Sequence, residues 1–397
     1  MSSLPNNWQI KSLGEVASIT AGQGAPQGDE NFSDKGYPFI RAGSLENLMN
    51  GSNYDQLEKI EEEKAKKHHL KLFLEGCILF AKSGMSSMKD RVIVLKSSAY
   101  VVSHLAVIQP NENLDSKYLA HWLGFFKPSR LIKDESYPSI SLDTVSKISV
   151  PFPPLPIQKQ IAVILEQADK AKQKRKEANK LTDEFLQSVF IEMFGDPVKN
   201  PKGWEIKSFD QLVEKFQYGT SIKSSLDGIP VLRIPNIIQG VLDLSDLKNV
   251  KLSEKEMHSL VLNINDILFV RTNGNPDFVG RCALYNLTGK YVFASYLIRA
   301  IVRKENVNSM FLVYLLGNSD YRNVIRSKCS TTAGQFNINT KGLGGLPIIL
   351  PHISLQQQFA EIVNKTDALK EKQKQSEQEL GNLFQSLMQK AFKGELV

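Results

Sequence analysis

Two polar loops of the sequence carry side chains of the kinds that bind nucleic acid. They span residues 82–91 and 271–281, and each follows a short apolar run, contains glycine, begins with a cation and ends with an arginine. Lysine and arginine neutralise phosphates, whereas short polar side chains reach base edges. The candidate DNA-binding residues of these loops are Lys82, Ser83, Lys89, Arg91, Arg271, Thr272, Asn273, Asn275 and Arg281. A solvent-exposed loop with an ordinary charge balance is the alternative interpretation.

Two further arginines, Arg41 and Arg233, are candidates for the same role. Each ends a Pro-x-x-Arg segment, at residues 38–41 and 230–233, within an apolar run that has the pattern of a strand. A guanidinium in apolar surroundings needs an acidic partner if it is buried. Contact with DNA and a buried ion pair are therefore equally acceptable interpretations of both residues.

The net charge of +7 is unevenly distributed over the 397 residues. Residues 1–157 carry 17 basic and 17 acidic side chains, whereas residues 195–354 carry 19 and 13. A basic surplus indicates a polyanionic partner, although it does not prove one. Since the first segment is neutral, any contact that it makes with DNA must come from a local patch.

The composition is that of an ordinary globular protein, with 42% apolar and 23% charged residues. No run approaches the ~18 apolar residues of a membrane span, and the first residues lack the basic and apolar regions of a signal peptide. We therefore expect a cytoplasmic protein with no membrane partner. Cys77, Cys282 and Cys329 lie far apart without a CxxC pattern, which argues against a disulfide framework and a metal site.

The chain is a tandem repeat of a unit of roughly 200 residues. Residues 7–12 recur as 203–208, residues 78–83 as 267–272, and residues 158–162 as 356–360, always in the same order. Within each copy, short apolar runs and a few helical stretches end at a proline cluster, which can continue neither a helix nor a central strand. A long helical pattern follows each cluster.

This pattern predicts an α+β (mixed α/β) fold with an internal pseudo-two-fold repeat. The expected domains are two similar globular domains at 1–156 and 196–354, and two long helices at 157–195 and 355–397. The helices carry apolar residues at alternating steps of three and four, as in a coiled coil. We expect them to pair with each other as an antiparallel coiled coil, since both copies share one register; a solvated single helix is the alternative.

The residues expected to pack between the two helices follow from this spacing. They are Ile161, Ile164, Ala168, Phe185, Val189, Phe359, Ile362, Leu369, Leu380, Leu383 and Leu387. Polar residues interrupt both seams, and such positions can fix register and orientation. Four more apolar residues of the first helix, Leu165, Leu186, Phe190 and Met193, either broaden this core or offer a docking surface to a partner.

Signatures of a self-contained enzyme are incomplete. Residues 275–278, Asn-Pro-Asp-Phe, resemble the Asn-Pro-Pro-Phe/Tyr motif of adenine methyltransferases, but an aspartate replaces the second proline. The glycines of residues 22–26 run into proline instead of opening a helix, as a cofactor-binding loop would. We expect no catalytic residue in this chain. A stand-alone adenine-specific DNA methyltransferase and a coiled-coil scaffold without DNA binding remain alternative hypotheses.

The duplicated motifs resemble those of the specificity subunits of Type I restriction-modification systems, over the whole chain. The marks are Trp8 and Trp204, the two Pro-x-x-Arg segments, the two Ile-Leu-Phe runs and the proline-rich Leu-x-x-Gln entry to each helix. Residues 331–338 are similar to the Gly-Gln-x-Asn-Ile loop of the family, which makes Gln335 a further DNA-binding candidate. The first copy departs from this pattern, with Ser-Tyr-Pro-Ser-Ile at residues 136–140.

The resemblance implies a non-catalytic subunit that reads DNA. Each of the two target recognition domains would read one half of a bipartite, asymmetric double-stranded target, while the helices set the gap and dock two methyltransferase subunits and, through them, restriction subunits. S-adenosylmethionine, ATP and magnesium would then belong to those partner subunits, with no cofactor in this chain.

Overall fold

The computed structural model describes residues 4–332 and 334–397, which form two compact units. The first unit contains residues 1–177 and 374–397, and the second contains residues 178–373. Each unit therefore takes one half of each long helix, α6 (Leu155–Phe194) and α11 (Ile353–Lys393), together with one globular domain. The compact units do not follow the linear division of the sequence.

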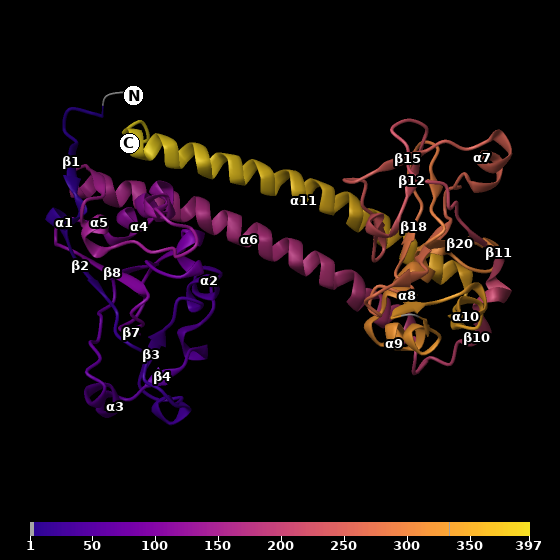
Figure 1. Cartoon of the computed structure of the whole chain (residues 1–397), viewed down its shortest axis with the longest axis horizontal. Helices are drawn as coiled ribbons and strands as arrows, with labels where there is room; N and C mark the ends of the chain where they lie inside the picture. The colour runs from indigo at the N-terminus through magenta and orange to yellow at the C-terminus, as the bar shows by residue number, and fades with distance from the viewer. Residues whose placement is uncertain (1–3, 333) are drawn as a thin grey trace. The chain divides into compact units, whose positions relative to one another are not determined.

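The first domain is built on three small sheets (Figure 1). A four-stranded antiparallel sheet has the order β2 (Ala17–Ala21), β8 (Leu105–Pro110), β5 (Ile78–Ala81) and β6 (Val92–Val94). A three-stranded sheet joins β4 (Lys59–Ile60), β3 (Tyr37–Ile40) and β7 (Tyr100–Val101), and a two-stranded sheet joins β1 (Gln9–Ser12) and β9 (Ser149–Phe152). The helices are α1 (Leu13–Val16), α2 (Ser44–Met49), α3 (Glu62–Lys67), α4 (Ser116–Phe126) and α5 (Leu142–Ser146).

The second domain repeats this topology strand for strand. The four-stranded sheet becomes β11 (Val213–Tyr218), β20 (Leu297–Val302), β16 (Ile267–Val270) and β18 (Cys282–Leu284). The three-stranded sheet becomes β15 (Lys248–Val250), β12 (Ile229–Leu232) and β19 (Val292–Phe293), and the two-stranded sheet becomes β10 (Glu205–Ser208) and β23 (Pro347–Leu350). The predicted mixed α/β class and internal repeat are confirmed.

The second domain also contains strands outside these three sheets, and helices of its own. The strands are β13 (Ile237–Ile238), β14 (Val241–Leu242), β17 (Thr272–Asn273), β21 (Ser330–Thr332) and β22 (Gln335–Asn337). The helices are α7 (Glu254–Leu260), α8 (Ser309–Gly317), α9 (Ser319–Ser327) and α10 (Thr340–Gly344). Within the described residues, no helix is long and apolar enough to cross a membrane.

A glycine at the end of the first sheet strand is required in both domains. A Cβ atom at Gly22 would lie 2.0 Å from the Val101 carbonyl oxygen, and one at Gly219 would lie 2.1 Å from the Phe293 carbonyl oxygen. Real Cβ atoms do not approach so closely. The repeat therefore extends to backbone contacts that only glycine permits.

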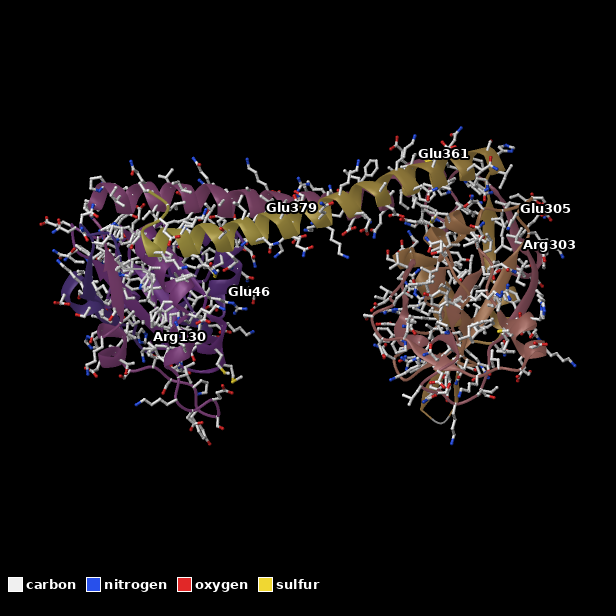
Figure 2. The ribbon with its side chains drawn as sticks, turned by 90° about the horizontal axis from the view of Figure 1, so that it is seen from above. Glu46, Arg130, Arg303, Glu305, Glu361 and Glu379 are labelled. Carbon is white, nitrogen blue, oxygen red and sulfur yellow. The ribbon has the colours of Figure 1, made fainter. Side chains whose placement is uncertain are left out.

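The long helices run antiparallel in each unit. In the second unit the Gln373 amide donates to the Thr182 hydroxyl over 3.0 Å, and Lys370 pairs with Asp183 over 2.8 Å. Residue numbers thus fall on α11 as they rise on α6. Charged residues such as Glu361 and Glu379 project from α11 into solvent (Figure 2). The predicted long helices and their antiparallel pairing are confirmed.

The residues predicted to pack between the helices are buried at some positions, whereas at others the neighbouring residue is buried instead. Ile161 and Phe359 are fully buried, but Phe185, Leu369 and Leu383 are 50%, 48% and 51% exposed. The prediction that these three pack between the helices is wrong. The remaining predicted residues are half-buried: Ile164, Ala168, Val189, Ile362, Leu380 and Leu387.

The displacement has a packing cause. Leu165 and Leu186 replace the predicted neighbours Ile164 and Phe185 as the deeply buried residues of α6. A helix buries a broader stripe than a coiled-coil seam when it packs on a globular domain as well as on a partner helix. The domain contacts therefore rotate the buried stripe by about one residue, or ~100°.

Four residues that the sequence offered as a possible docking surface form core instead. Leu165, Leu186 and Phe190 are at most 2% exposed. Leu165 belongs to the core of the first unit, whereas Leu186 and Phe190 belong to that of the second, against which Met193 packs. The Phe190 ring lies 5.0 Å from that of Phe194 and 5.5 Å from that of Phe359, between ring centres. Of the two interpretations, the structure selects the core.

The second domain buries an ion pair at two positions where the first domain has uncharged residues. Arg299 on β20 contacts Asp266 over 2.5 Å, with 3% and 4% of the two side chains exposed. Burial raises the pKa of the Asp266 carboxyl, while Arg299 and the backbone N–H of Asn263 favour its charged form. Strand register places Cys77 and Val107 at the equivalent positions of the first domain.

This ion pair gives a stability prediction. Replacing only Arg299 by valine leaves Asp266 buried without its partner and should destabilise the second unit by about 3–5 kcal/mol. The double variant Asp266→Cys with Arg299→Val reproduces the first domain's chemistry and should recover most of that loss. Chemical denaturation of both variants measures the difference, and a double variant as unstable as the single one would contradict it.

Candidate nucleic-acid interface

Two segments far apart in the second domain's sequence form one surface. Strand β17 (Thr272–Asn273), at the start of the loop 271–281, pairs with β22 (Gln335–Asn337), which also pairs with β21. The Arg271 carbonyl accepts a 2.9 Å hydrogen bond from the Ile338 amide. The sheet therefore brings the two candidate segments of this domain, which sequence reasoning treated separately, into contact.

Gln335 is oriented by a neighbouring candidate. The hydroxyl of Thr272, which is 8% exposed, donates to the Gln335 side-chain oxygen over 3.1 Å. The amide nitrogen of Gln335 makes no hydrogen bond within the described residues, and the residue is exposed. Thr272 thus acts as a support, and Gln335 presents an oriented donor to solvent.

Two arginines of this loop are held against aromatic rings. The Arg271 guanidinium lies 4.8 Å from the centre of the Tyr218 ring, and that of Arg281 lies 3.8 Å from the centre of the Phe278 ring. Stacking holds a guanidinium in a defined plane without neutralising it. Both cations can therefore meet a phosphate or a guanine edge with less loss of side-chain entropy than a free arginine.

The two asparagines shape the loop that carries these arginines. The side-chain oxygen of Asn273 accepts from the Asn275 amide, and that of Asn275 accepts from the Asp277 amide, both over 2.9 Å. Asp277 pairs with Arg326 of α9 rather than with Arg281. These bonds use the oxygens of the asparagines and leave their NH₂ groups at an open surface.

The first domain builds the same arrangement from different residues. The Lys82 carbonyl accepts from the Ile140 amide over 2.7 Å, and the Pro138 carbonyl accepts from the Gly84 amide over 2.9 Å. Ser83 bridges to Ser139, and its hydroxyl lies 2.8 Å from a ring nitrogen of His104. Residues 136–140 therefore occupy the place of the second domain's Gln335 segment, although their sequence departs from it.

The cations of the first loop differ in their freedom. Lys82 is half-buried and Lys89 is exposed, and neither forms an ion pair within the described residues. Arg91 pairs with Glu46 of α2 and is only 15% exposed. The two lysines thus remain unneutralised cations of the loop, whereas Arg91 joins two elements of the domain.

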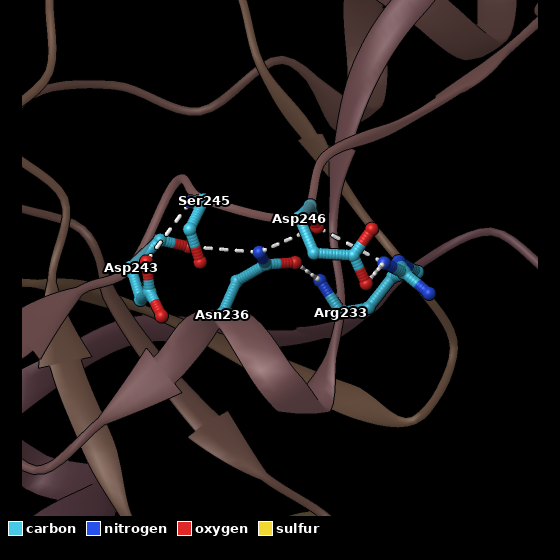
Figure 3. A network of polar contacts seen from close by, with 5 residues as sticks. All are labelled: Arg233, Asn236, Asp243, Ser245 and Asp246. Carbon is cyan, nitrogen blue, oxygen red and sulfur yellow. Dashed lines mark hydrogen bonds and ion pairs between the residues drawn. The ribbon is translucent and has the colours of Figure 1, made fainter. Parts of the chain in front are cut away.

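Arg41 and Arg233 are both held in ion pairs. Arg41 pairs with Glu58 over 2.9 Å while remaining 43% exposed. Arg233 contacts the carboxylate of Asp246 over 2.8 Å, within a network that includes Asn236 (Figure 3). The structure favours the ion-pair interpretation for both, with Arg41 still partly accessible.

Sequence reasoning missed exposed aromatic residues beside these loops. Tyr218 and Tyr296 are 40% and 59% exposed next to Arg271, and Tyr137 of the first domain is 82% exposed. The Tyr296 carbonyl accepts from the Arg271 amide. Only the strand pairing reveals this proximity, since these residues lie at least 15 positions in the sequence from the loops that they flank.

Two copies of one binding surface, each backed by the same sheet, define the class of protein. Each surface combines cations with aromatic rings, and the second adds the side-chain amides of its loop; these are side chains of the kinds that contact phosphates and bases. Within the described residues no three His, Cys, Asp or Glu side chains gather as metal ligands would. The molecule is thus a duplicated recognition module carried on a helix pair.

Comparison with known proteins gives the family. Residues 5–182 and 201–381 both match the type I restriction modification DNA specificity domain, so the chain belongs to this family. It is 26% identical over 423 residues to the StySPI specificity subunit of Salmonella potsdam, covering 99% of this chain and 90% of that protein. Identity to the EcoKI specificity subunit of Escherichia coli K12 is 25% over 422 residues, with the same coverage.

Solved structures share the fold at lower identity. A chain from a study of complex assembly and conformational transition of the type I R-M system has a TM-score of 0.62 at 19% identity, covering 99% of this chain and 100% of that one. The S subunit from M. genitalium has a TM-score of 0.58 at 13% identity, with 98% of each chain covered. These comparisons give no support to a stand-alone methyltransferase.

The stacked arginine gives a binding prediction. Replacing Arg271 by alanine should weaken duplex binding, by ~1–3 kcal/mol if the side chain contacts a base, or with a salt slope reduced by about one if it contacts a phosphate. Titrations over a salt series distinguish the two outcomes. Arg91→Ala is the control and should leave the slope unchanged, because Glu46 already pairs with Arg91. Unchanged binding by Arg271→Ala at every salt concentration would contradict the assignment.

Proposed function

We propose that this chain is the DNA-specificity subunit of a type I restriction-modification complex, and that each domain reads one half of a bipartite, asymmetric duplex target. The observation that carries the proposal is the repeated surface. Both domains set a loop after the central strand, β5 or β16, against a second segment through the same backbone hydrogen bond. Two domains with the same backbone fold but different side chains on this surface could read two different half-sites.

Catalysis belongs, in this proposal, to partner chains. Two methyltransferase subunits would dock on this chain, and restriction subunits would join through them. S-adenosylmethionine, ATP and magnesium would bind those subunits, and this chain would contribute recognition and position. The antiparallel helices support a further role as the spacer between the two half-sites.

Exchange of one domain tests this division of labour. Replacing residues 1–150 with the equivalent segment of a relative should change one half of the methylated sequence and leave the other half and the gap unaltered. Methylation mapping of a genome in cells that express the subunit with its methyltransferase gives the motif directly. A simultaneous change in both halves would contradict the model of two independent readers.

We infer that the methyltransferases dock at an exposed apolar position on each unit. Phe185 in the second unit and Leu383 in the first occupy equivalent positions of the repeat, 50% and 51% exposed. Leu181, one helical turn before Phe185, is 58% exposed. Exposed apolar residues clustered on a helix face mark protein interfaces. One such position in each repeat fits two copies of one partner.

The docking sites predict a stepwise loss of subunits. Phe185→Glu and Leu383→Glu should each remove one methyltransferase subunit from the purified complex, and the double variant should remove both, because a charge would have to be buried in the interface. Sedimentation or native mass measurement gives the stoichiometry. Gln187→Glu and Gln385→Glu place the same charge at equivalent, exposed positions and serve as controls. Intact complexes from all variants would disprove the assignment.

A further inference from the structure

The two domains carry opposite chemistry at one equivalent place on their recognition surfaces. In the first domain residues 82–84 run antiparallel to residues 138–140, and the next residue on each segment is Met85 and Tyr137. The side chains of these two residues are 67% and 82% exposed. Two large, mainly apolar side chains, the Met85 thioether and the Tyr137 ring with its hydroxyl, thus stand at the tip of the loop pair, beyond the last backbone hydrogen bond.

The hydrogen bond that is shared by the domains locates the counterparts. The bond from Ile140 to Lys82 corresponds to that from Ile338 to Arg271. Because the segments are antiparallel, the same place is found three residues after the acceptor and three residues before the donor. In the first domain these are Met85 and Tyr137, and in the second they are Gly274 and Gln335. An apolar pair therefore stands where the second domain has a glycine and an oriented amide.

We propose that Met85 and Tyr137 insert into a base step of the half-site read by the first domain, whereas Gln335 reads a base edge in the second half-site. The inference rests on the proposed function and assigns the mode of contact. Met85 has no group that distinguishes the hydrogen-bonding patterns of bases, so it gains by leaving water rather than by reading an edge. The extended apolar surfaces of duplex DNA are the base faces, which a bulky wedge reaches by partly unstacking one step.

The charges of the first domain agree with this mode of contact. Residues 1–157 have no net charge, so long-range attraction to phosphates is weak over this domain. Lys82 and Lys89 nevertheless lie on the same loop as Met85, without ion-pair partners in the described part of the chain. They are placed to hold the backbone phosphates beside a wedge, while the apolar pair supplies contact that does not depend on salt.

Fluorescence of 2-aminopurine tests the insertion, because this base brightens when it is unstacked. The probe is a duplex that carries the mapped methylation motif, with 2-aminopurine at one purine at a time, excluding the methylated adenine, which the methyltransferase itself would extrude. Bound to the complete methyltransferase complex, one step of the first half-site should brighten several-fold. Met85→Gly with Tyr137→Gln should abolish that rise.

Control variants separate the wedge from a general loss of apolar surface. Leu74 is an exposed apolar residue, 58% exposed, that precedes β5, whereas the loop with Met85 follows β5. The control variant Leu74→Ala should therefore keep the full rise in fluorescence. The reciprocal variant Gly274→Met with Gln335→Tyr should create a rise in the second half-site; a Cβ at Gly274 meets no atom within 4 Å.

The outcomes distinguish this inference from the proposed function. A complex that binds and methylates its motif, yet shows no rise at any step or a rise that persists in the double variant, overturns the wedge. A complex that neither binds nor methylates any duplex overturns the proposed function itself. Loss of the rise in the Met85→Gly with Tyr137→Gln variant, with the second half-site still methylated, supports the inference.

Discussion

A buried glutamine at the start of each long helix joins that helix to its domain. Gln158 and Gln356 are fully buried, and their amides donate to the carbonyls of Pro153 and Pro351 over 2.8 and 2.7 Å. Their side-chain oxygens accept from the backbone of the residues that cap α4 and α8. An unpaired buried amide costs about 1–3 kcal/mol, so both partners are held together. In each repeat, the glutamine thus connects the proline turn, the long helix and the domain through hydrogen bonds, and this connection is called the joint below.

The joint and the recognition surface lie at opposite ends of the same strand. At the start of β16, the Ser309 hydroxyl of α8 donates to the Asn265 carbonyl over 2.8 Å, whereas the loop 271–281 begins where β16 ends. The strand itself is fully buried and pairs on both sides. Side chains at the recognition end can therefore differ between the domains without disturbing the joint. This separation explains how Gln335 and Tyr137 occupy one place on the same frame.

Local patterns in the sequence were sufficient for the repeat, the two long helices and the mixed α/β class. They were not sufficient to predict which residues are buried by tertiary contacts. The helix spacing predicted Phe185 in the seam, but contact with the globular domain makes Leu186 the buried residue instead. The partners of candidate cations were also out of reach, since Glu46 lies 45 positions before Arg91. No local pattern identifies which distant carboxylate a surface arginine will meet.

In the proposed mode of binding, the two domains differ in the forces that hold DNA as well as in the sequence that they read. The second domain combines a basic surplus with arginines held on Tyr218 and Phe278, so its proposed contacts with DNA would include phosphate attraction that weakens with salt. The first domain is neutral and exposes Met85 and Tyr137, whose contribution comes from apolar burial that salt does not screen. As ionic strength rises, the balance of binding free energy therefore shifts toward the first domain's half-site. Because the two domains carry different side chains on the same backbone fold, one orientation of the chain on an asymmetric target is more stable than the reverse.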